Sequence, residues 1–180
     1  MKILWLLFFL LPLNLLAQVF PVDAASGKIY YAEEVLVKDG PKTDLYNRAR
    51  HWFTAFGKNK KALKTDDAAN GILIGSSYSL LEVYDGNKMQ TLKLWCTVKL
   101  ELEDDRYWYS ISDFRLQNTN PTQKIVANVA QMKTEPVEDL VLPEKDANLK
   151  GKDRQFNMSV ETAAHKSILA LIKDIKANML

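Results

Sequence analysis

The side chains that most often carry catalysis are few in this sequence and lie far apart. The two histidines are His51 and His165, and the one cysteine is Cys96. A zinc site needs His or Cys ligands at short paired spacings, and a nucleophilic triad needs a Ser or Cys beside a His and a carboxylate. Neither spacing occurs, so we expect no metal site, no cofactor and no Ser or Cys nucleophile.

Carboxylates are more common, and some of them are adjacent in the chain. The adjacent pairs are Glu33-Glu34, Asp66-Asp67 and Asp104-Asp105. All three fall at predicted strand ends or turns, where solvated acids are usual. Asp113 and Arg115 are different, because a deep pocket shared with His51 would make them a candidate hydrolase site. A simple ion pair at a bulge would remove that interpretation.

Three aromatic residues form the most specific candidate for a binding face. They are Tyr30, Trp95 and Trp108, and each is predicted on the side of its strand that points away from the core. Grouped aromatics at a surface are typical of recognition sites. Three interpretations stay open. The C-terminal tail could fold across this face and bury the three, the face could bind an envelope protein, a glycan or a second copy, or the three could be scattered exposed residues without a role.

Residues 92–102 give the clearest strand pattern. Apolar residues occupy every even position and mostly polar residues occupy the odd ones, which predicts one buried face and one outer face. Asp85-Gly86-Asn87 predicts the hairpin turn before this strand. The partner strand, residues 106–116, changes its apolar phase near Ser112-Asp113, which predicts a β-bulge there.

Other elements follow from the same periodicities. Strands are predicted at 28–38, 62–66 and 72–84, where Ile72, Ile74, Tyr78 and Leu80 alternate with small residues. A helix should begin at Thr43 or Asp44, pack on the even side of residues 92–102 through Trp52, and end at Gly57. Ser159 should cap a final helix. The order strand-helix-strand-strand-strand-strand, then a C-terminal helix, predicts an α+β fold with about five antiparallel strands and a helix on one sheet face.

The N-terminus predicts the compartment. Residues 1–17 combine Lys2 with a long apolar run and a small residue, Ala17, near a plausible cleavage point. This is typical of a signal peptide, so we expect a periplasmic or secreted protein cut near Ala17. An uncleaved anchor is the alternative. The chain has 24 Lys+Arg and 22 Asp+Glu residues, a net charge of +2, which argues against nucleic-acid binding. No later segment is apolar enough to cross a membrane.

Four segments together resemble a known family. They are Phe20-Pro-Val-Asp23 with Gly27-Lys-Ile-Tyr-Tyr31, Leu45-Tyr-Asn-Arg-Ala-Arg-His-Trp-Phe53, Lys93-Leu-Trp-Cys-Thr-Val-Lys-Leu-Glu101, and Arg106-Tyr-Trp-Tyr-Ser-Ile-Ser-Asp-Phe-Arg115. The pattern resembles the exported bacterial family called domain of unknown function 4468, which has a TATA-binding-protein-like fold. The resemblance covers residues 20–117 and, more loosely, the tail. It implies a curved antiparallel sheet with a helix on one face, and it transfers no activity and no site residues.

The resulting domain organisation is a signal peptide at 1–17, an α+β domain at 20–117, a connector at 118–158 and a C-terminal helix at 159–180. The leading hypothesis is an exported, non-catalytic domain that binds a partner or ligand through the sheet face or the crevice between sheet and tail. One alternative is a structural or self-associating envelope component that acts through the C-terminal helix. A hydrolase around Asp113 is a further alternative.

Overall fold

The computed structural model describes residues 20–56, 63–119, 134–142 and 149–180. The predicted signal peptide, the predicted stop at Gly57 and parts of the predicted connector lie outside these ranges. The elements, in chain order, are β1 (Tyr31–Leu36), α1 (Lys42–Phe56), β2 (Leu63–Asp67), β3 (Ile72–Asp85), β4 (Lys88–Glu103), β5 (Arg106–Asn118), β6 (Glu135–Pro136), α2 (Glu138–Val141) and α4 (Lys152–Met179).

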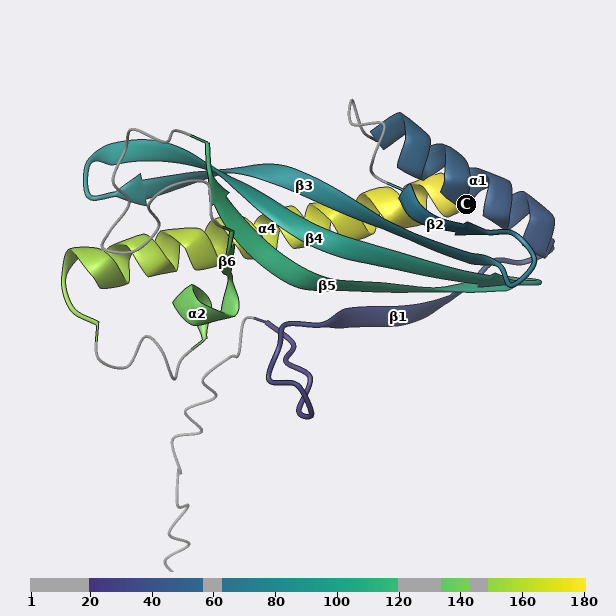
Figure 1. The fold of residues 1–180 in the computed structure, drawn as a ribbon, viewed down its shortest axis with the longest axis horizontal. Helices are drawn as coiled ribbons and strands as arrows, with labels where there is room; N and C mark the ends of the chain where they lie inside the picture. Colours follow the sequence, from purple (N-terminus) through teal and green to yellow (C-terminus); the bar gives the residue numbers. More distant parts are fainter. Residues whose placement is uncertain (1–19, 57–62, 120–133, 143–148) are drawn as a thin grey trace, which may run out of the picture.

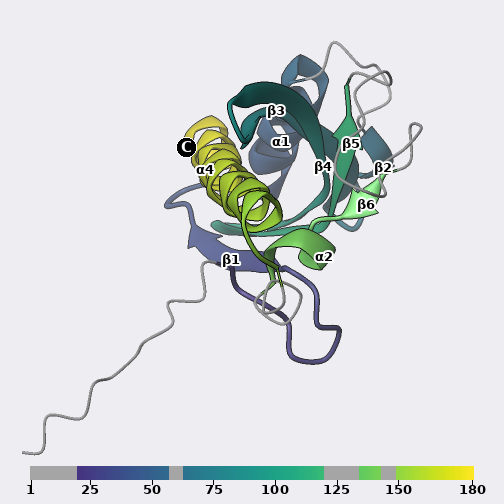
Figure 2. The ribbon, with the colours of Figure 1, turned by 90° about the vertical axis from the view of Figure 1, so that its left-hand side faces the viewer.

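The strands form one antiparallel sheet, so the predicted α+β class is confirmed. Its strand order is β1-β5-β4-β3-β2, and the short β6 pairs with β5. The sheet is strongly curved and wraps around α4, as Figure 2 shows. Both α1 and α4 lie on the inner side of this curve (Figure 1), and neither of these two long helices covers the opposite side of the sheet.

The alternation along β4 is confirmed. The six even-numbered side chains, Leu92, Leu94, Cys96, Val98, Leu100 and Leu102, are all buried in the core. Their odd-numbered neighbours are only partly buried and form the outer face of the sheet. Trp52 joins the same core cluster, as predicted, together with Leu45, Ala49 and Phe53 of α1. Each fully buried leucine contributes roughly 1.5–3 kcal/mol to folding, so this strand is the centre of the core.

The predicted β-bulge is also confirmed. Trp95 pairs with Arg115 whereas Thr97 pairs with Ser112, so β5 holds one residue more than β4 at this point. Asp113 takes the extra place with a positive φ of 59°. Aspartate tolerates this conformation better than most residues because its short polar side chain can bond locally. The bulge explains the phase change, because Ile111 and Phe114 are both buried across it.

Several predicted boundaries were wrong. α1 begins at Lys42, so Thr43 and Asp44 lie inside its first turn, and β2 spans Leu63–Asp67, one residue later than predicted. β1 begins at Tyr31 and not at Lys28, because Ile29 leaves the ladder and forms an isolated bridge with Val22. The final helix begins at Lys152 and not at Ser159, so Ser159 lies inside α4. Three charged residues at the start of α4 hide its helical period in the sequence, although Phe156 and Val160 already share its buried side.

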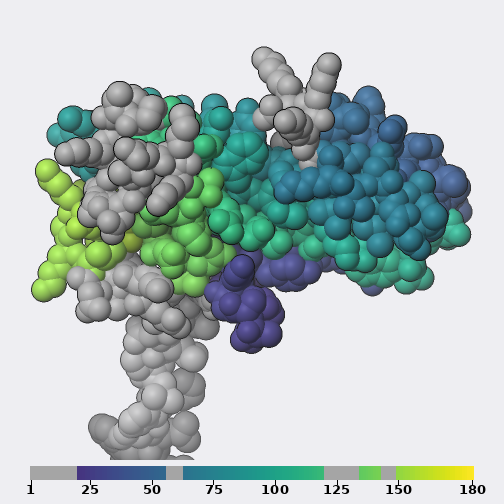
Figure 3. Space-filling model, viewed as in Figure 1, coloured from purple at the N-terminus to yellow at the C-terminus, as the bar shows by residue number. Residues whose placement is uncertain are grey.

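The position of α4 answers one question that the sequence left open. Its apolar stripe, including Val160, Ala164 and Ile168, is buried in the same core as β4. The indole of Trp52 donates a hydrogen bond to Asp174 of α4 at 2.7 Å, which ties the two helices together. The helix therefore does not cover the outer face of the sheet. In the space-filling view of Figure 3, the strands form much of the visible surface and most of α4 is hidden behind them.

No helix in the described ranges, α4 included, combines the length and the apolar character that a membrane span needs.

Candidate functional site

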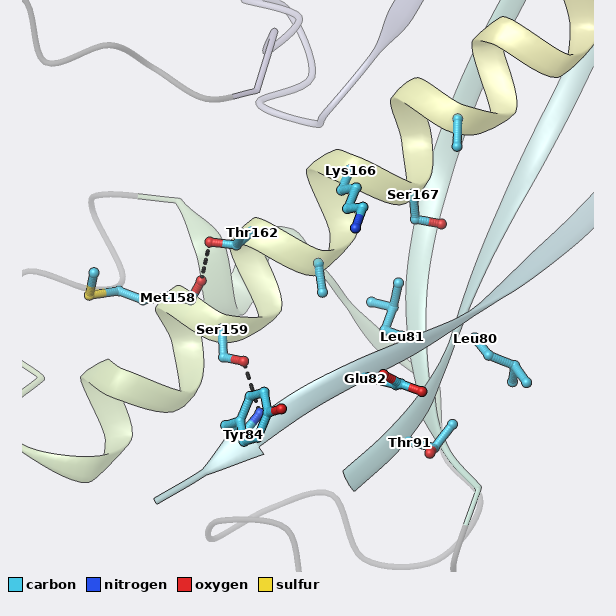
Figure 4. Close-up of a pocket in the computed structure, with 12 residues that line it drawn as sticks. Leu80, Leu81, Glu82, Tyr84, Thr91, Met158, Ser159, Thr162, Lys166 and Ser167 are labelled. Atoms are coloured by element: carbon cyan, nitrogen blue, oxygen red, sulfur yellow. Dashed lines mark hydrogen bonds between the residues drawn. The ribbon is translucent and has the colours of Figure 1, made fainter. Parts of the chain in front are cut away.

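A groove of about 840 Å³ runs between β3 and α4 (Figure 4). Leu80, Leu81 and Tyr84 line it from β3, and Met158 and Lys166 line it from α4. Leu80, Tyr84 and Met158 are more than half exposed, at 61%, 57% and 54%. Apolar side chains gathered on both walls of a concave surface are typical of a ligand or partner site.

The groove lies along an open edge of the sheet. β2 pairs with β3 only as far as Gly75, and beyond that residue no described strand pairs with this side of β3. The backbone N–H of Tyr84 points out of this edge and donates a hydrogen bond to Ser159 Oγ of α4 at 2.8 Å. Backbone groups alternate in direction along a strand, so the N–H groups of Leu80 and Glu82 point into the groove as well. No strand among the described residues pairs with the N–H groups of Leu80 and Glu82, so within that part of the chain this edge of β3 is open.

The two walls carry opposite charges. Lys166 extends from α4 toward β3, and Glu82 lies on the facing strand (Figure 4). The ion pairs found among the described residues involve other side chains, so these two are paired neither with each other nor elsewhere in that part of the chain. The groove therefore offers one cation and one anion to an occupant.

An aromatic cluster adjoins the groove on the outer face. Tyr78 and Trp95 are cross-strand partners with ring centroids 4.8 Å apart, and Lys93 Nζ lies 4.9 Å from the Tyr78 centroid and 5.9 Å from that of Trp95. The Trp95 indole donates a hydrogen bond to Gln117 at 2.9 Å, which fixes the ring. Lys93 is in turn the cross-strand partner of Leu80, so this cluster and the groove form one continuous surface.

The three aromatics named from the sequence do not form one cluster. Trp108 is paired with Glu101, about 20 Å along the sheet from Trp95 at roughly 3.3 Å per residue. Its ring lies 5.7 Å from the guanidinium of Arg106. Tyr30 precedes β1, is exposed, and donates its backbone N–H to the Pro21 carbonyl. Trp95 alone lies beside the groove.

Sequence reasoning missed Tyr78 as a partner of Trp95. The alternation of Ile72, Ile74, Tyr78 and Leu80 correctly predicted a strand, but it did not show which side faces the core. The structure places Gly75 and Ser77 inward with Leu73, Leu81 and Val83, and it places Tyr78 and Leu80 outward. The small size of Gly75 and Ser77 was the signal in the sequence for this orientation. Small side chains can face the core there because α4 fills the space on the inner side of the sheet.

The acidic candidates lie elsewhere. Asp113 forms ion pairs of 3.9 Å with Arg115 and with Lys28, and all three side chains are about half exposed. This is the ion-paired arrangement at a bulge, and it does not favour a hydrolase site. Among the described residues, no group of three or more His, Cys, Asp and Glu side chains could hold a metal ion.

Cys96 is buried, as predicted. Desolvation raises the pKa of its thiol to about 12, so the reactive thiolate is suppressed near neutral pH. The residue packs within the core beside Ser77 of β3 and faces away from the groove's aromatic rim.

The fold and these surfaces define an α+β domain with an open antiparallel sheet, two helices on its inner side and a groove at one edge. The family model "Domain of unknown function (DUF4468) with TBP-like fold" matches residues 31–117, which confirms the predicted resemblance to that family for this part of the chain. A search of curated proteins found no match.

Two crystal structures share the fold. The chain is similar to a TBP-like protein from Parabacteroides distasonis ATCC 8503, with 19% identity, a TM-score of 0.64, and 89% of this chain and 97% of the other covered. It is also similar to a DUF4468 family protein from Bacteroides ovatus ATCC 8483, with 10% identity, a TM-score of 0.66, and 91% of each chain covered. At these identities the likeness shows the fold alone, and the function must be argued from the site.

Proposed function

We propose that the mature chain is an exported, non-catalytic binding domain. Its binding surface is the groove between β3 and α4, extended by the aromatic rim of Tyr78, Trp95 and Lys93. The observation that carries this proposal is the exposure of apolar side chains on both walls of a groove of about 840 Å³. Such a volume is within the usual range for small-molecule sites, roughly 300–1,000 Å³.

The absence of catalysis is supported by where the shifted carboxylates lie. Hydrogen bonds from Lys176 and Tyr109 lower the pKa of Glu33, and that contact joins β1 and β5 to α4. Hydrogen bonds from Tyr46 and Arg50 lower the pKa of Asp66, and they join α1 to β2. Catalytic groups often have shifted pKa values, but these carboxylates connect structural elements and lie outside the groove.

Self-association through α4 has less support. The apolar stripe that suggested it, which includes Ile168 and Ile175, is buried against the chain's own sheet. That stripe is therefore not free to join a larger assembly, and the groove remains the better supported surface.

Export rests on residues 1–17 and has its own test. Mass spectrometry of the protein recovered from the periplasmic fraction or the medium should give the mass of a chain that begins at Gln18, with this residue as glutamine or pyroglutamate. Recovery of chains that still begin at Met1, only in the cytoplasmic fraction, would contradict export.

Binding is tested by a pull-down from the envelope fraction with three immobilised proteins. These are the mature wild type, Leu80→Arg in the groove, and the matched control Leu36→Arg on β1. Leu36 is also exposed, at 74%, and lies at the opposite edge of the sheet. We expect a partner that the wild type and Leu36→Arg retain and that Leu80→Arg loses. Equal recovery by all three, or nothing recovered beyond the bare resin, would contradict the proposed site.

A further inference from the structure

We infer that the groove accepts an extended peptide segment, which joins the sheet as an additional strand beside β3. This inference rests on the proposed function and specifies the occupant. Its first support is the open edge, where the backbone groups of Tyr78, Leu80 and Glu82 have no partner strand among the described residues. A peptide strand would satisfy this row of donors and acceptors, which a globular or purely apolar ligand would not.

The groove also fits the side chains of such a strand. Successive side chains of an added strand point alternately to the two faces of the sheet. One set would face α4 beside Leu81 and Ala163, and the other would lie on the outer face beside Leu80 and Tyr84. The apolar side chains that now face solvent would then be covered.

The charges on the two walls of the groove restrict which peptides could bind there. Lys166 lies on the α4 side and Glu82 on the strand side, and neither has an ion-pair partner in the described part of the chain. The complementary peptide has an acidic side chain directed toward α4 and a basic side chain on its opposite face. A second copy does not supply this pattern through its own β3, because β3 carries Glu82 and Asp85 but no Lys or Arg. Pairing of β3 with the β3 of a second copy is therefore disfavoured, and the inference commits to a segment of a different protein as the occupant.

The test begins with a random peptide library displayed on phage and selected on the mature protein. Selected peptides should alternate apolar and polar residues and should carry an acidic residue on one face and Lys or Arg on the other. The strongest binder is then synthesised with a single N-methyl group at each residue in turn. We expect every second N-methyl group to weaken binding at least about tenfold and the intervening ones to leave it unchanged, because only alternate N–H groups face β3.

A protein variant provides the matching evidence. Leu80→Pro removes an N–H group that points out of the edge and leaves the ladder between β3 and β4 intact, a position where proline is tolerated. It should weaken the same peptide at least about tenfold, whereas Leu36→Arg should not. Should Leu80→Pro fail to fold, the N-methyl series still decides.

Four results would overturn the inference. Three of them are no enrichment above the bare support, an N-methyl series without alternation, and binding that is unaffected by a folded Leu80→Pro variant. Dimerisation through β3, seen as a doubled mass in light scattering that Leu80→Pro abolishes, would overturn it as well. If the envelope partner is still lost with Leu80→Arg in any of these cases, the proposed function stands and strand addition alone fails.

Discussion

Replacing Ile168 with alanine should destabilise the whole domain. Ile168 lies in the middle of α4 and is 1% exposed, whereas its neighbour Leu169 is 47% exposed. Truncation of a buried isoleucine to alanine costs about 2–5 kcal/mol, the sum of lost transfer free energy and the cavity left behind. Leu169→Ala removes the same number of carbon atoms from the same helix, yet a surface change of this kind is usually within about 0.5 kcal/mol.

The assay is urea and thermal unfolding of the mature protein, followed by two probes. Circular dichroism at 222 nm reports the helices, and tryptophan fluorescence reports Trp52 in α1 together with Trp95 and Trp108 on the sheet. Because α4 and the sheet share one core, both probes should shift together. At about 2–4 °C per kcal/mol for a domain of this size, the Ile168→Ala midpoint should fall by roughly 4–20 °C.

Two outcomes would refute this reasoning. Equal destabilisation by Ile168→Ala and Leu169→Ala would mean that α4 does not present the side seen in the structure. A change in the circular dichroism transition without a change in fluorescence would mean that α4 unfolds as a separate unit.

Three further predictions concern single residues. Gly71→Ala should destabilise the fold much more than Gly86→Ala. Both glycines have positive φ, but only at Gly71 would a Cβ collide with a backbone carbonyl of β4. Equal thermal midpoints of the two variants would disprove this prediction. Glu33→Gln should lower the free energy of unfolding at neutral pH, because the hydrogen bond from Lys176 lowers the pKa of Glu33 and stabilises the folded protein. This stabilisation is lost as the pH falls through the lowered pKa, so the difference between variant and wild type should vanish on acidification. A difference in urea titrations that does not depend on pH would contradict this prediction. Cys96 should resist iodoacetamide at pH 8 in the folded protein and react once urea is added, and rapid labelling of the native protein would show that the thiol is not buried.

The sequence predicts this fold best where one pattern repeats many times. Six alternations from Leu92 to Leu102 leave little doubt about which face of β4 is buried, since a slip of one residue would expose the whole apolar set. The phase change near Asp113 is equally local, because a bulge must shift the buried face of its own strand.

The groove could not be predicted in this way. Whether β3 has an open edge depends on the strand order and on where β2 ends, and neither follows from local residue patterns. The orientation of Tyr78 depends on α4, which fills the inner side of the sheet opposite small residues. The sequence did not predict the start of α4 because the first turn of this helix is charged. The helix extends back to Lys152 because Phe156 packs in the core, and local helix propensity does not set this boundary.

Amide hydrogen exchange, followed residue by residue by NMR on the free mature protein at low concentration, tests the open edge of β3 most directly. We predict rapid exchange at Leu80 and Glu82, slow exchange at Leu81 and Val83, which face β4, and protection at Tyr84 by Ser159. Uniformly slow exchange from Leu80 to Tyr84 would mean that this edge is already paired, and the groove would lose its role as a binding site.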